Sequence, residues 1–264
     1  MQDITLRALD VLRQVECVAA EDTRVTRVLL DRHGIRTPMI ALHEHNEARS
    51  AQRVIALLQE GKSLALVSDA GTPAISDPGA LLVRRVQEAG LRVVPVPGPS
   101  ALATLLSVAG LDDGRFLFLG FPPPQASARR RLFDGVRDLP YAIVLYEAPH
   151  RVRETVQDLA GAFGTQRRLV IGRELTKLHE SVHATALGAA LEWLDADANR
   201  LKGEFVLAIE PGAGTNDEQA EEGERVLALL LAELPLKQAV KLAAEITGAK
   251  RNALYQRALE LKGE

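Results

Sequence analysis

The strongest constraint on the fold is a rigid, turn-rich loop that directly follows an apolar stretch. Residues 64–67 (LALV) are apolar, and the twelve residues after them, 68–79, contain two aspartates, two glycines and two prolines. Glycine permits close backbone approach, and proline fixes the backbone before a ligand arrives. A strand that ends in such a loop predicts an open α/β sheet with a ligand at the carboxyl edge of its strands.

A second unit of the same kind follows along the chain. Residues 92–96 read as a strand, residues 97–100 (PGPS) end it, and residues 101–109 continue as a helix with Ser100 as its N-cap. Two such units in succession favour a pocket between the loops, although ordinary turns of a parallel sheet have the same pattern. The other expected elements of this half are helices at 4–15, 25–30, 47–59 and 80–89 and strands at 18–20, 39–42 and 64–67. This alternation predicts a mostly parallel sheet.

The second half of the chain continues the alternation and then changes character. Residues 217–224 are acidic and are expected to form a solvated linker, and residues 235–261 favour two helices around Gly248. The expected strands lie at 116–119, 142–146, 169–172 and 204–209. We therefore expect an α/β fold with an N-terminal α/β domain at 1–112, a C-terminal α/β domain at 113–213, an acidic linker or helix at 214–234 and a small helical tail at 235–264.

Composition narrows the function classes. The chain has 264 residues, 47% of them hydrophobic, and a net charge of −3, so contacts with a polyanion must come from local basic patches. A single cysteine, Cys17, excludes an intrachain disulfide and argues against a cysteine-based metal site. The longest apolar stretch, 93–111, is broken by prolines and glycines, which argues against a membrane helix. No signal peptide is expected from the acidic start, so we expect a cytoplasmic protein.

Three short segments, each following an apolar strand, place acidic and basic side chains together. They are residues 21–24, 147–151 and 173–177. One such cluster is usually a surface ion pair that contributes little to stability. Three of them at equivalent positions favour a shared polar cleft at the carboxyl edges of the sheets.

Two basic patches suit contacts with phosphate groups, which are mainly electrostatic and not sequence-specific. The first is the run Arg129, Arg130 and Arg131, together with Arg137; a solvated loop has the same composition. The second is the tail from residue 235, which has six lysines and arginines against three glutamates, a surplus of three positive charges. Lys250 and Arg251 lie at its centre.

An H-E-x-x-H pattern at His179, Glu180 and His183 supports a rival interpretation as a zinc hydrolase. That site needs a helix, so that the two histidines share one face. Residues 181–185 instead alternate polar and apolar side chains, which predicts a strand. On a strand the histidines would lie roughly 13 Å apart and would not share one ion.

Taken together, the motifs resemble the tetrapyrrole methylase superfamily and, within it, the ribosomal RNA small-subunit methyltransferase I branch. The resemblance covers nearly the whole chain, and the tail from residue 241 to Tyr255 resembles the small helix-turn-helix-like end of that branch. The segments that carry it are residues 3–9 (DITLRAL), 20–24 (AEDTR), 68–73 (SDAGTP), 75–79 (ISDPG), 97–101 (PGPSA), 146–151 (YEAPHR), 173–177 (RELTK) and 203–205 (GEF).

The resemblance implies two α/β domains with S-adenosylmethionine in the cleft between them. It also implies a homodimer that methylates the 2′-oxygen of a cytidine ribose in the decoding centre of 16S rRNA. At matching positions it assigns the cofactor to Ala70, Gly71, Thr72, Ile75, Ser100, Ala101, Tyr146 and Glu147.

One departure from the family pattern lies at the start of the chain. The family begins with a further strand and a Pro-x-Gly-containing loop ahead of residues 3–9, whereas Met1 and Gln2 stand in that place here. The resemblance therefore implies a truncated or mis-started chain that lacks a central strand of the first sheet and one wall of the cleft.

The implied reaction needs a base or a cation near the ribose hydroxyl, which is a poor nucleophile at neutral pH. The candidate catalytic residues are Glu21, Asp22, Glu147 and Lys177, and the candidate RNA contacts are Arg24, Arg129, Arg130, Arg131, Arg151, Lys250 and Arg251. No metal ion is expected. A related methyltransferase acting on a tetrapyrrole or a protein would have no use for the basic tail. A non-catalytic RNA-binding protein would keep the basic patches but bind no cofactor.

Overall fold

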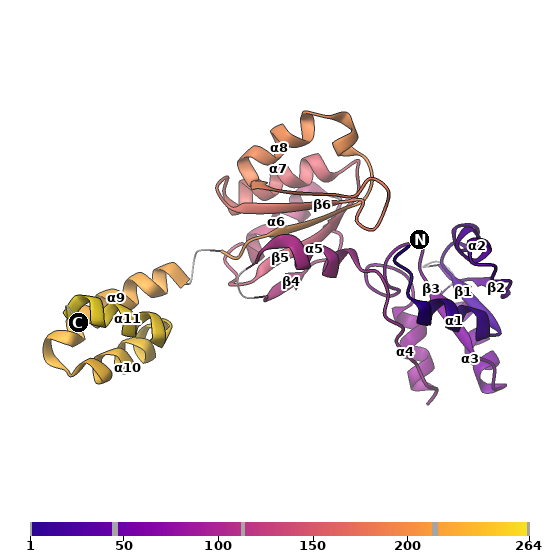
Figure 1. Cartoon of the computed structure of the whole chain (residues 1–264), viewed down its shortest axis with the longest axis horizontal. Coiled ribbons are helices and arrows are strands. Elements are labelled where there is room, and N and C mark those ends of the chain that lie inside the picture. Colours follow the sequence, from indigo (N-terminus) through magenta and orange to yellow (C-terminus); the bar gives the residue numbers. More distant parts are fainter. Residues whose placement is uncertain (1, 44–46, 112–113, 213–215, 263–264) are drawn as a thin grey trace.

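A computed structural model describes residues 2–43, 47–111, 114–212 and 216–262. It contains a three-stranded sheet and a five-stranded sheet, each flanked by helices, and a group of helices at the C-terminal end. These three parts follow one another along the long axis of the molecule (Figure 1). Within the described residues, no helix combines the length and the apolar character needed to cross a membrane.

The first sheet is parallel, as the sequence predicted. Its strand order is β2-β1-β3, and Ala20 at the end of β1 pairs with both Ala41 and Val67. All three strands therefore end at one edge of the sheet, and the loops that follow them start side by side. The strands are β1 (Cys17–Ala20), β2 (Met39–Ala41) and β3 (Leu64–Val67).

Helices cover both faces of this sheet because successive strand residues point to opposite sides. Val18 and Ala20 pack with one pair of helices, α1 (Leu6–Gln14) and α2 (Thr23–Arg32). Ala19, from the same strand, packs on the other side with α3 (Glu47–Gln59) and α4 (Ala80–Glu88). The predicted helices and the three short strands are confirmed to within a few residues at their ends.

The predicted strand at residues 92–96 is not formed. Val93 and Val94 are 40% and 58% exposed, and no described residue hydrogen-bonds to the backbone of this stretch. A strand requires a neighbour to bond with, and an apolar sequence alone does not supply one. Pro95 and Pro97 further reduce the number of N–H groups that could join a ladder.

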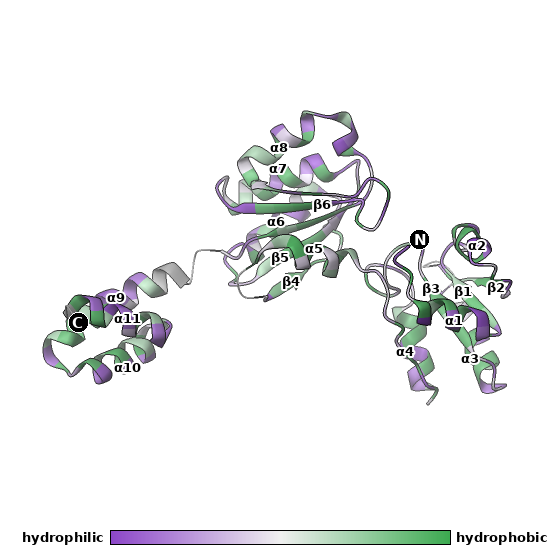
Figure 2. Ribbon diagram, in the orientation of Figure 1, coloured by the Kyte–Doolittle hydropathy of each residue, from purple (hydrophilic) through white to green (hydrophobic). Residues whose placement is uncertain are grey.

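The second sheet is mixed and has the order β4-β5-β8-β6-β7. Strand β4 is parallel to β5, and the other neighbours are antiparallel. Glu147 and Arg173 both pair with Phe205, so β5 and β6 end at the same edge, where β8 begins. The strands are β4 (Phe116–Phe118), β5 (Ala142–Glu147), β6 (Arg168–Arg173), β7 (Ser181–Ala186) and β8 (Phe205–Ile209). Figure 2 shows these strands mostly in the green of hydrophobic residues.

The second sheet is also covered on both faces. One face packs against three helices that lie together in Figure 1, namely α6 (Ala126–Val136), α7 (Val152–Phe163) and α8 (Leu187–Asp195). The short helix η2 (Ala198–Leu201) follows α8.

The other face packs against α5 (Ala101–Ala109), whose Leu105 and Ala109 are fully buried against Val170 and Val206. The domain boundary predicted after residue 112 assigned this helix to the first domain. The packing instead changes before Ala101, because α5 buries its apolar side chains on the second sheet. Residues 112–113, between which the boundary was predicted, lie outside the described residues.

Helices α9 (Asn216–Glu233), α10 (Leu236–Thr247) and α11 (Arg251–Lys262) form the C-terminal part and pack on one another. The two predicted helices around Gly248 are confirmed. The acidic segment 217–224 lies in the first half of α9, so of the two predicted alternatives, linker or helix, the structure has the helix. The second half of that helix buries Leu227 in the core of the tail, and the helix extends from there toward its N-terminus.

Candidate active site

The ends of β1 and β3 are joined by two exchanged hydrogen bonds. Glu21 Oε2 accepts from the Asp69 backbone N–H at 3.1 Å, and Asp69 Oδ1 accepts from the Asp22 backbone N–H at 3.0 Å. Each carboxylate thus holds the loop that carries the other. The carboxyl edge of the first sheet is therefore a fixed acidic surface rather than two independent turns.

The two loops in which the sequence predicted a cofactor lie beside each other. The Thr72 hydroxyl donates to the Pro99 carbonyl at 3.1 Å, and the Thr5 hydroxyl donates to the Pro97 carbonyl at 3.1 Å. Ser100 caps α5 as predicted, since its hydroxyl accepts from the Ala103 N–H at 3.4 Å. These bonds place the start of α5 next to residues 70–79.

Backbone strain is concentrated in two loops. Among the described residues other than glycine, only four have positive φ: Ala74 (68°), Ser76 (63°), Glu174 (51°) and Thr176 (66°). Each such conformation costs about 1–2 kcal/mol, and such strain clusters at functional sites. One loop follows β3 of the first sheet and the other follows β6 of the second sheet.

The two strained loops face each other. The charges of Glu21, Asp69 and Glu204 all act on Asp77, which lies in the first loop. Glu204 pairs with Lys177 at 3.1 Å, and Lys177 lies in the second loop. Charged groups next to strands of both sheets therefore influence Asp77.

Two glycines show how closely the backbones approach at this point. A Cβ built on Gly120, which follows β4, would lie 3.1 Å from the Ser76 hydroxyl oxygen. A Cβ built on Gly203 would collide with the side chain of Glu174. Both glycines have positive φ, so a side chain there would be strained as well as crowded.

Asp77 is the carboxyl group whose acidity changes most in this cleft. Burial, followed by the negative charge of Glu21, raises the pKa of Asp77 to about 6, although the Ser68 hydroxyl acts in the opposite direction. The adjacent cavity of about 330 Å³ is lined by Glu47, Ser76, Asp77, Pro78, Gly79 and Ala80. Glu47 holds this loop against α4, because its Oε1 accepts from the N–H groups of Gly79 and Leu82 at 3.1 and 3.0 Å.

Tyr146, near the end of β5, connects the second sheet to the same place. Burial raises the pKa of its phenol, the backbone of Leu102 and the side chain of Ser100 lower it, and the charge of Asp77 raises it. The Tyr146 ring makes edge contacts with Phe118 at 4.9 Å and with the half-exposed Phe121 at 5.7 Å between ring centres. The Tyr146 phenol is therefore influenced both by the start of α5 and by the charge of Asp77.

Lys177 remains a cation in this arrangement. Burial opposes its charge, but hydrogen bonds to Glu174 and Glu204 raise the pKa of Lys177 above its ordinary value. Burial likewise opposes the charge of Glu174, but the Glu204 backbone N–H and Lys177 together lower the pKa of Glu174. Lys177 is thus a fixed positive charge between two carboxylates.

Comparison with known proteins decides the family. Residues 1–191 match the family of tetrapyrrole (corrin/porphyrin) methylases, and residues 217–262 match the RsmI C-terminal HTH domain. The chain belongs to the tetrapyrrole methylase family.

Curated relatives match the methylase chain over nearly all of its length. It is 48% identical over 263 residues to ribosomal RNA small subunit methyltransferase I of Escherichia coli O157:H7, a match that covers 100% of the chain and 92% of that protein. The protein of the same name from Pseudomonas aeruginosa is 48% identical over 266 residues, covering 100% and 94%. The resemblance found in the sequence is therefore confirmed.

Solved methyltransferase structures share the fold. The crystal structure of the methyltransferase CobJ has a TM-score of 0.58 and 16% identity, covering 80% of this chain and 90% of that one. Uroporphyrin-III-C-methyltransferase from Thermus thermophilus has a TM-score of 0.54 and 21% identity, covering 79% and 88%. These likenesses concern the fold alone, and they confirm the expected α/β class with two sheets.

The residues predicted as candidates for the catalytic base have different surroundings in this tetrapyrrole methylase. Asp22 caps α2 by accepting from the Arg24 N–H at 2.8 Å, and the Arg24 guanidinium lowers the pKa of Asp22 to about 2. Such an acid holds a proton weakly. Arg24 itself is exposed at the edge of the first sheet.

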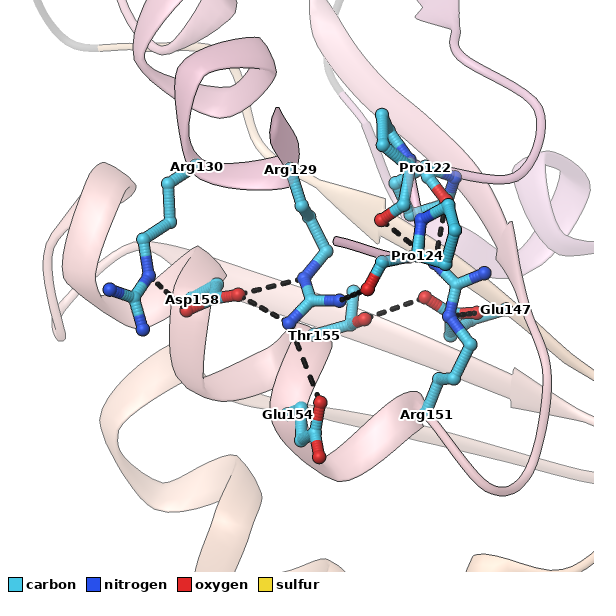
Figure 3. Close-up of polar contacts among 10 residues, drawn as sticks. Pro122, Pro124, Arg129, Arg130, Glu147, Arg151, Glu154, Thr155 and Asp158 are labelled. Atoms are coloured by element: carbon cyan, nitrogen blue, oxygen red, sulfur yellow. Dashed lines mark hydrogen bonds and ion pairs between the residues drawn. The ribbon is translucent and has the colours of Figure 1, made fainter. Parts of the chain in front are cut away.

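Glu147 is the most deeply placed of the predicted site residues. It is 1% exposed, accepts from the Thr155 hydroxyl at 2.6 Å and the Ala148 N–H at 2.8 Å, and lies 3.3 Å from Arg151 Nε. Arg151 in turn donates to the carbonyls of Pro122 and Pro123 (Figure 3). In this structure Glu147 is part of a buried network beneath the loop at residues 120–124, and only its neighbour Tyr146 reaches the cleft.

The predicted RNA-binding arginines are divided between surface and interior. Arg129 is 1% exposed and pairs with Asp158, its Nη2 lying 2.6 Å from Oδ2, so the structure gives it no accessible charge for RNA. Arg130 reaches the other oxygen of Asp158 at 2.7 Å but remains largely exposed (Figure 3). Arg131 on α6, and Lys250 and Arg251 at the start of α11, are exposed.

The H-E-x-x-H segment has no zinc-site geometry. His183 lies on strand β7, as predicted, and stacks on Trp193 with ring centres 4.1 Å apart, whereas His179 is exposed in the preceding loop. Among the described residues, no group of three or more histidine, cysteine and acidic side chains is placed to hold a metal ion.

Several residues of the cleft were not predicted to belong to it, among them Asp77, Glu204 and Phe121. Asp77 and Glu204 each lie within two residues of a glycine with positive φ, Gly79 and Gly203, in the segments 75–79 and 203–205. Their proximity to such glycines is a local signal. That they face each other depends on how the two sheets meet, which no local pattern reports.

Proposed function

We propose that this protein transfers a methyl group from S-adenosylmethionine to the ribose 2′-oxygen of a cytidine in the decoding centre of 16S rRNA. The observation that carries the proposal is the full-length match, at 48% identity, to proteins named ribosomal RNA small subunit methyltransferase I. The match of residues 217–262 to the RsmI C-terminal HTH domain supports the same substrate class. The nucleotide and the 2′-oxygen rest on the resemblance described for the sequence.

The cleft fits S-adenosylmethionine in its chemistry. When bound, this cofactor supplies an electrophilic methyl group on a positively charged sulfur. Asp69 and Glu204 give the cleft the negative charge that complements a sulfonium. The backbone of residues 70–75 and the start of α5 at Ser100 and Ala101 present polar groups on one side, and Tyr146 offers an aromatic ring on the other. These residues would hold the cofactor.

The acidic cleft also indicates where the RNA backbone binds. Phosphates are repelled by carboxylates, so the RNA backbone is expected to contact cations at the periphery, with the target ribose reaching inward. Arg24 lies exposed at the edge of the first sheet, and Arg131 lies exposed on α6. Lys250 and Arg251 supply positive charge on the helical tail. RNA binding through these side chains should weaken as the salt concentration rises.

The test is methyl transfer to small ribosomal subunits that lack the modification. The purified protein is incubated with such subunits and S-adenosylmethionine labelled in its methyl group, and the rRNA is digested to nucleosides. We expect label in 2′-O-methylcytidine from one position of 16S rRNA. Label in a tetrapyrrole or in a ribosomal protein would instead support a related methyltransferase. Subunit binding without cofactor binding would support a non-catalytic RNA-binding protein.

We further propose that the protein acts as a homodimer in the cytoplasm, where the small subunit is assembled. The homodimer is implied by the resemblance, and the cytoplasmic location by the proposed substrate. Light scattering at micromolar concentration tests the first proposal, with a mass of two chains as the expected result. A mass of one chain over the working concentration range would count against it.

A further inference from the structure

Asp77 is distinguished from the other carboxylates of the cleft by its lack of a committed partner. Glu21 and Asp69 accept backbone N–H groups from each other's loops, and Glu204 pairs with Lys177. Asp77 forms no ion pair with any described residue, and the nearby Ser68 hydroxyl, which lowers the pKa of Asp77, donates to the Ala70 carbonyl at 3.1 Å. Among the described carboxylates of this edge, Asp77 is therefore the one that holds neither a backbone N–H group nor a cation.

The backbone holds Asp77 in place before any ligand binds. Ser76, on its N-terminal side, is in the left-handed region, and Pro78, on its C-terminal side, has a fixed φ and restricts the residue before it. The loop is closed by the Ala74 N–H, which donates to the Pro78 carbonyl at 3.3 Å. Glu47 anchors the loop's end at Gly79. Fixed placement of this kind is what a group that meets a reacting atom requires.

We propose that Asp77 is the general base that receives the proton of the ribose 2′-hydroxyl during methyl transfer. This inference rests on the proposed function. The 2′-oxygen forms a bond to the methyl carbon while the methyl–sulfur bond breaks, and the bonding pair stays on sulfur, which becomes a neutral thioether. The hydroxyl proton passes to the Asp77 carboxylate, which becomes a neutral carboxylic acid. Charge balances because one cation and one anion are neutralised together.

The surroundings of Asp77 suit this role. Burial and the charges of Glu21, Asp69 and Glu204 raise its pKa to about 6, so at pH 7 it is mostly ionised yet more basic than an ordinary aspartate. The groups facing it are Glu21 and Asp69 from the first sheet, Tyr146 from β5 and Glu204, beside Lys177, before β8. Lys177 is the cation in this group, and it already pairs with Glu174 and Glu204.

The other predicted bases are less suited. The Arg24 guanidinium holds the pKa of Asp22 near 2, so Asp22 accepts a proton poorly at neutral pH. Glu147 is 1% exposed, and both of its oxygens accept hydrogen bonds within the protein. A substrate hydroxyl would have to displace those donors to reach it.

The test compares Asp77→Asn with Asp77→Glu and with Asp31→Asn, an exposed aspartate at the end of α2 that serves as control. Each variant is checked for fold by circular dichroism and for S-adenosylmethionine binding by calorimetry. Single-turnover methyl transfer to small subunits is then measured from pH 5 to pH 9. Asp77→Asn should lower the rate at pH 7.5 by about 10²–10⁴-fold, with cofactor affinity within about threefold of wild type.

The pH profile separates a base from a structural residue. The wild-type rate should rise with pH through about 6 and then level off, and Asp77→Asn should lose that rise, whereas Asp77→Glu should keep it at a reduced rate. An Asp77→Asn rate and profile equal to wild type would overturn the inference while wild-type activity upheld the proposed function. Loss of cofactor binding in Asp77→Asn would also overturn it, because Asp77 would then hold the cofactor. An inactive wild type would refute the proposed function itself.

Discussion

Replacing Asp158 with alanine should destabilise the second α/β unit strongly, because it leaves Arg129 buried without its carboxylate. Asp158 Oδ2 lies 2.7 Å from Arg129 Nε and 2.6 Å from Nη2, and the two side chains are only 4% and 2% exposed (Figure 3). Arg129 also donates to the Pro124 carbonyl at 3.2 Å. The pair therefore joins α6, α7 and the loop at residues 120–124.

The magnitude follows from burial. Removing one partner of a buried ion pair typically costs about 3–5 kcal/mol, because the remaining charge is poorly hydrated. The remaining carboxylate near Arg129 is Glu154, 3.7 Å from Nη2, and it is 70% exposed, so it replaces Asp158 only weakly. The second contact of Asp158, with the 65% exposed Arg130, adds little, since solvent screens it. At about 2–4 °C per kcal/mol for a protein of this size, the melting temperature should fall by roughly 6–20 °C.

Asp195→Ala is the matched control for this change. Asp195 forms the same kind of pair with Arg153, at 2.9 Å, but the two side chains are 43% and 52% exposed, so solvent screens the pair and its loss should cost far less stability. Thermal unfolding followed by circular dichroism measures both variants. Arg129→Met with Asp158→Ala should recover much of the loss, because no buried charge then remains. Equal destabilisation by Asp158→Ala and Asp195→Ala would refute the reasoning.

Three further outcomes are expected. In an NMR titration, Asp22 should have a pKa of about 2, and the variant Arg24→Ala should return this pKa toward about 3.9. Because the pKa of Asp22 is lower in the folded state, the stability that Asp22 contributes is present above about pH 4 and is lost as the pH falls toward 2. Ala74→Gly should raise the free energy of unfolding by up to about 1 kcal/mol, since glycine relieves the positive φ, and calorimetry should show weaker cofactor binding by the looser loop. Glu147→Gln should lower the free energy of unfolding, measured by urea denaturation, by about 1–3 kcal/mol, because the carboxylate that accepts from the Thr155 hydroxyl is lost. In the same variant, the pH at which the methyl-transfer rate levels off should stay unchanged.

Elements with strong local signals were predictable from the sequence. The helix at 47–59 has apolar residues at helical spacing, and the strand at 64–67 is an apolar run between a glycine and a turn. Residues 92–96 look equally strand-like but remain without a ladder, because a strand depends on a neighbour that its own sequence does not specify. The acidic segment 217–224 is helical because it continues a helix that buries Leu227.

The loops that form the candidate site could be predicted from the sequence, but the functions of individual residues in them could be predicted less well. The motifs correctly indicated that residues 70–79 and 97–100 lie together, as the bond from the Thr72 hydroxyl to the Pro99 carbonyl shows, although no described strand of the sheet leads into the second segment. Arg129 was expected on the surface, since its partner Asp158 lies on a different helix and no pattern in the arginine run reveals it. Asp77 was overlooked because its environment depends on burial and on the charges of Glu21, Asp69 and Glu204, of which Glu21 and Glu204 lie far from it in the chain.

The central claim is that loops from both sheets form one binding cleft, and hydrogen–deuterium exchange with S-adenosylmethionine tests it most directly. Exchange is compared with and without saturating cofactor on the intact protein. Peptides spanning residues 68–79, the start of α5 at Ser100, and Tyr146 should all become protected together, with the helical tail unchanged. Binding of the cofactor with protection of only one of these segments, or of none, would contradict a shared cleft.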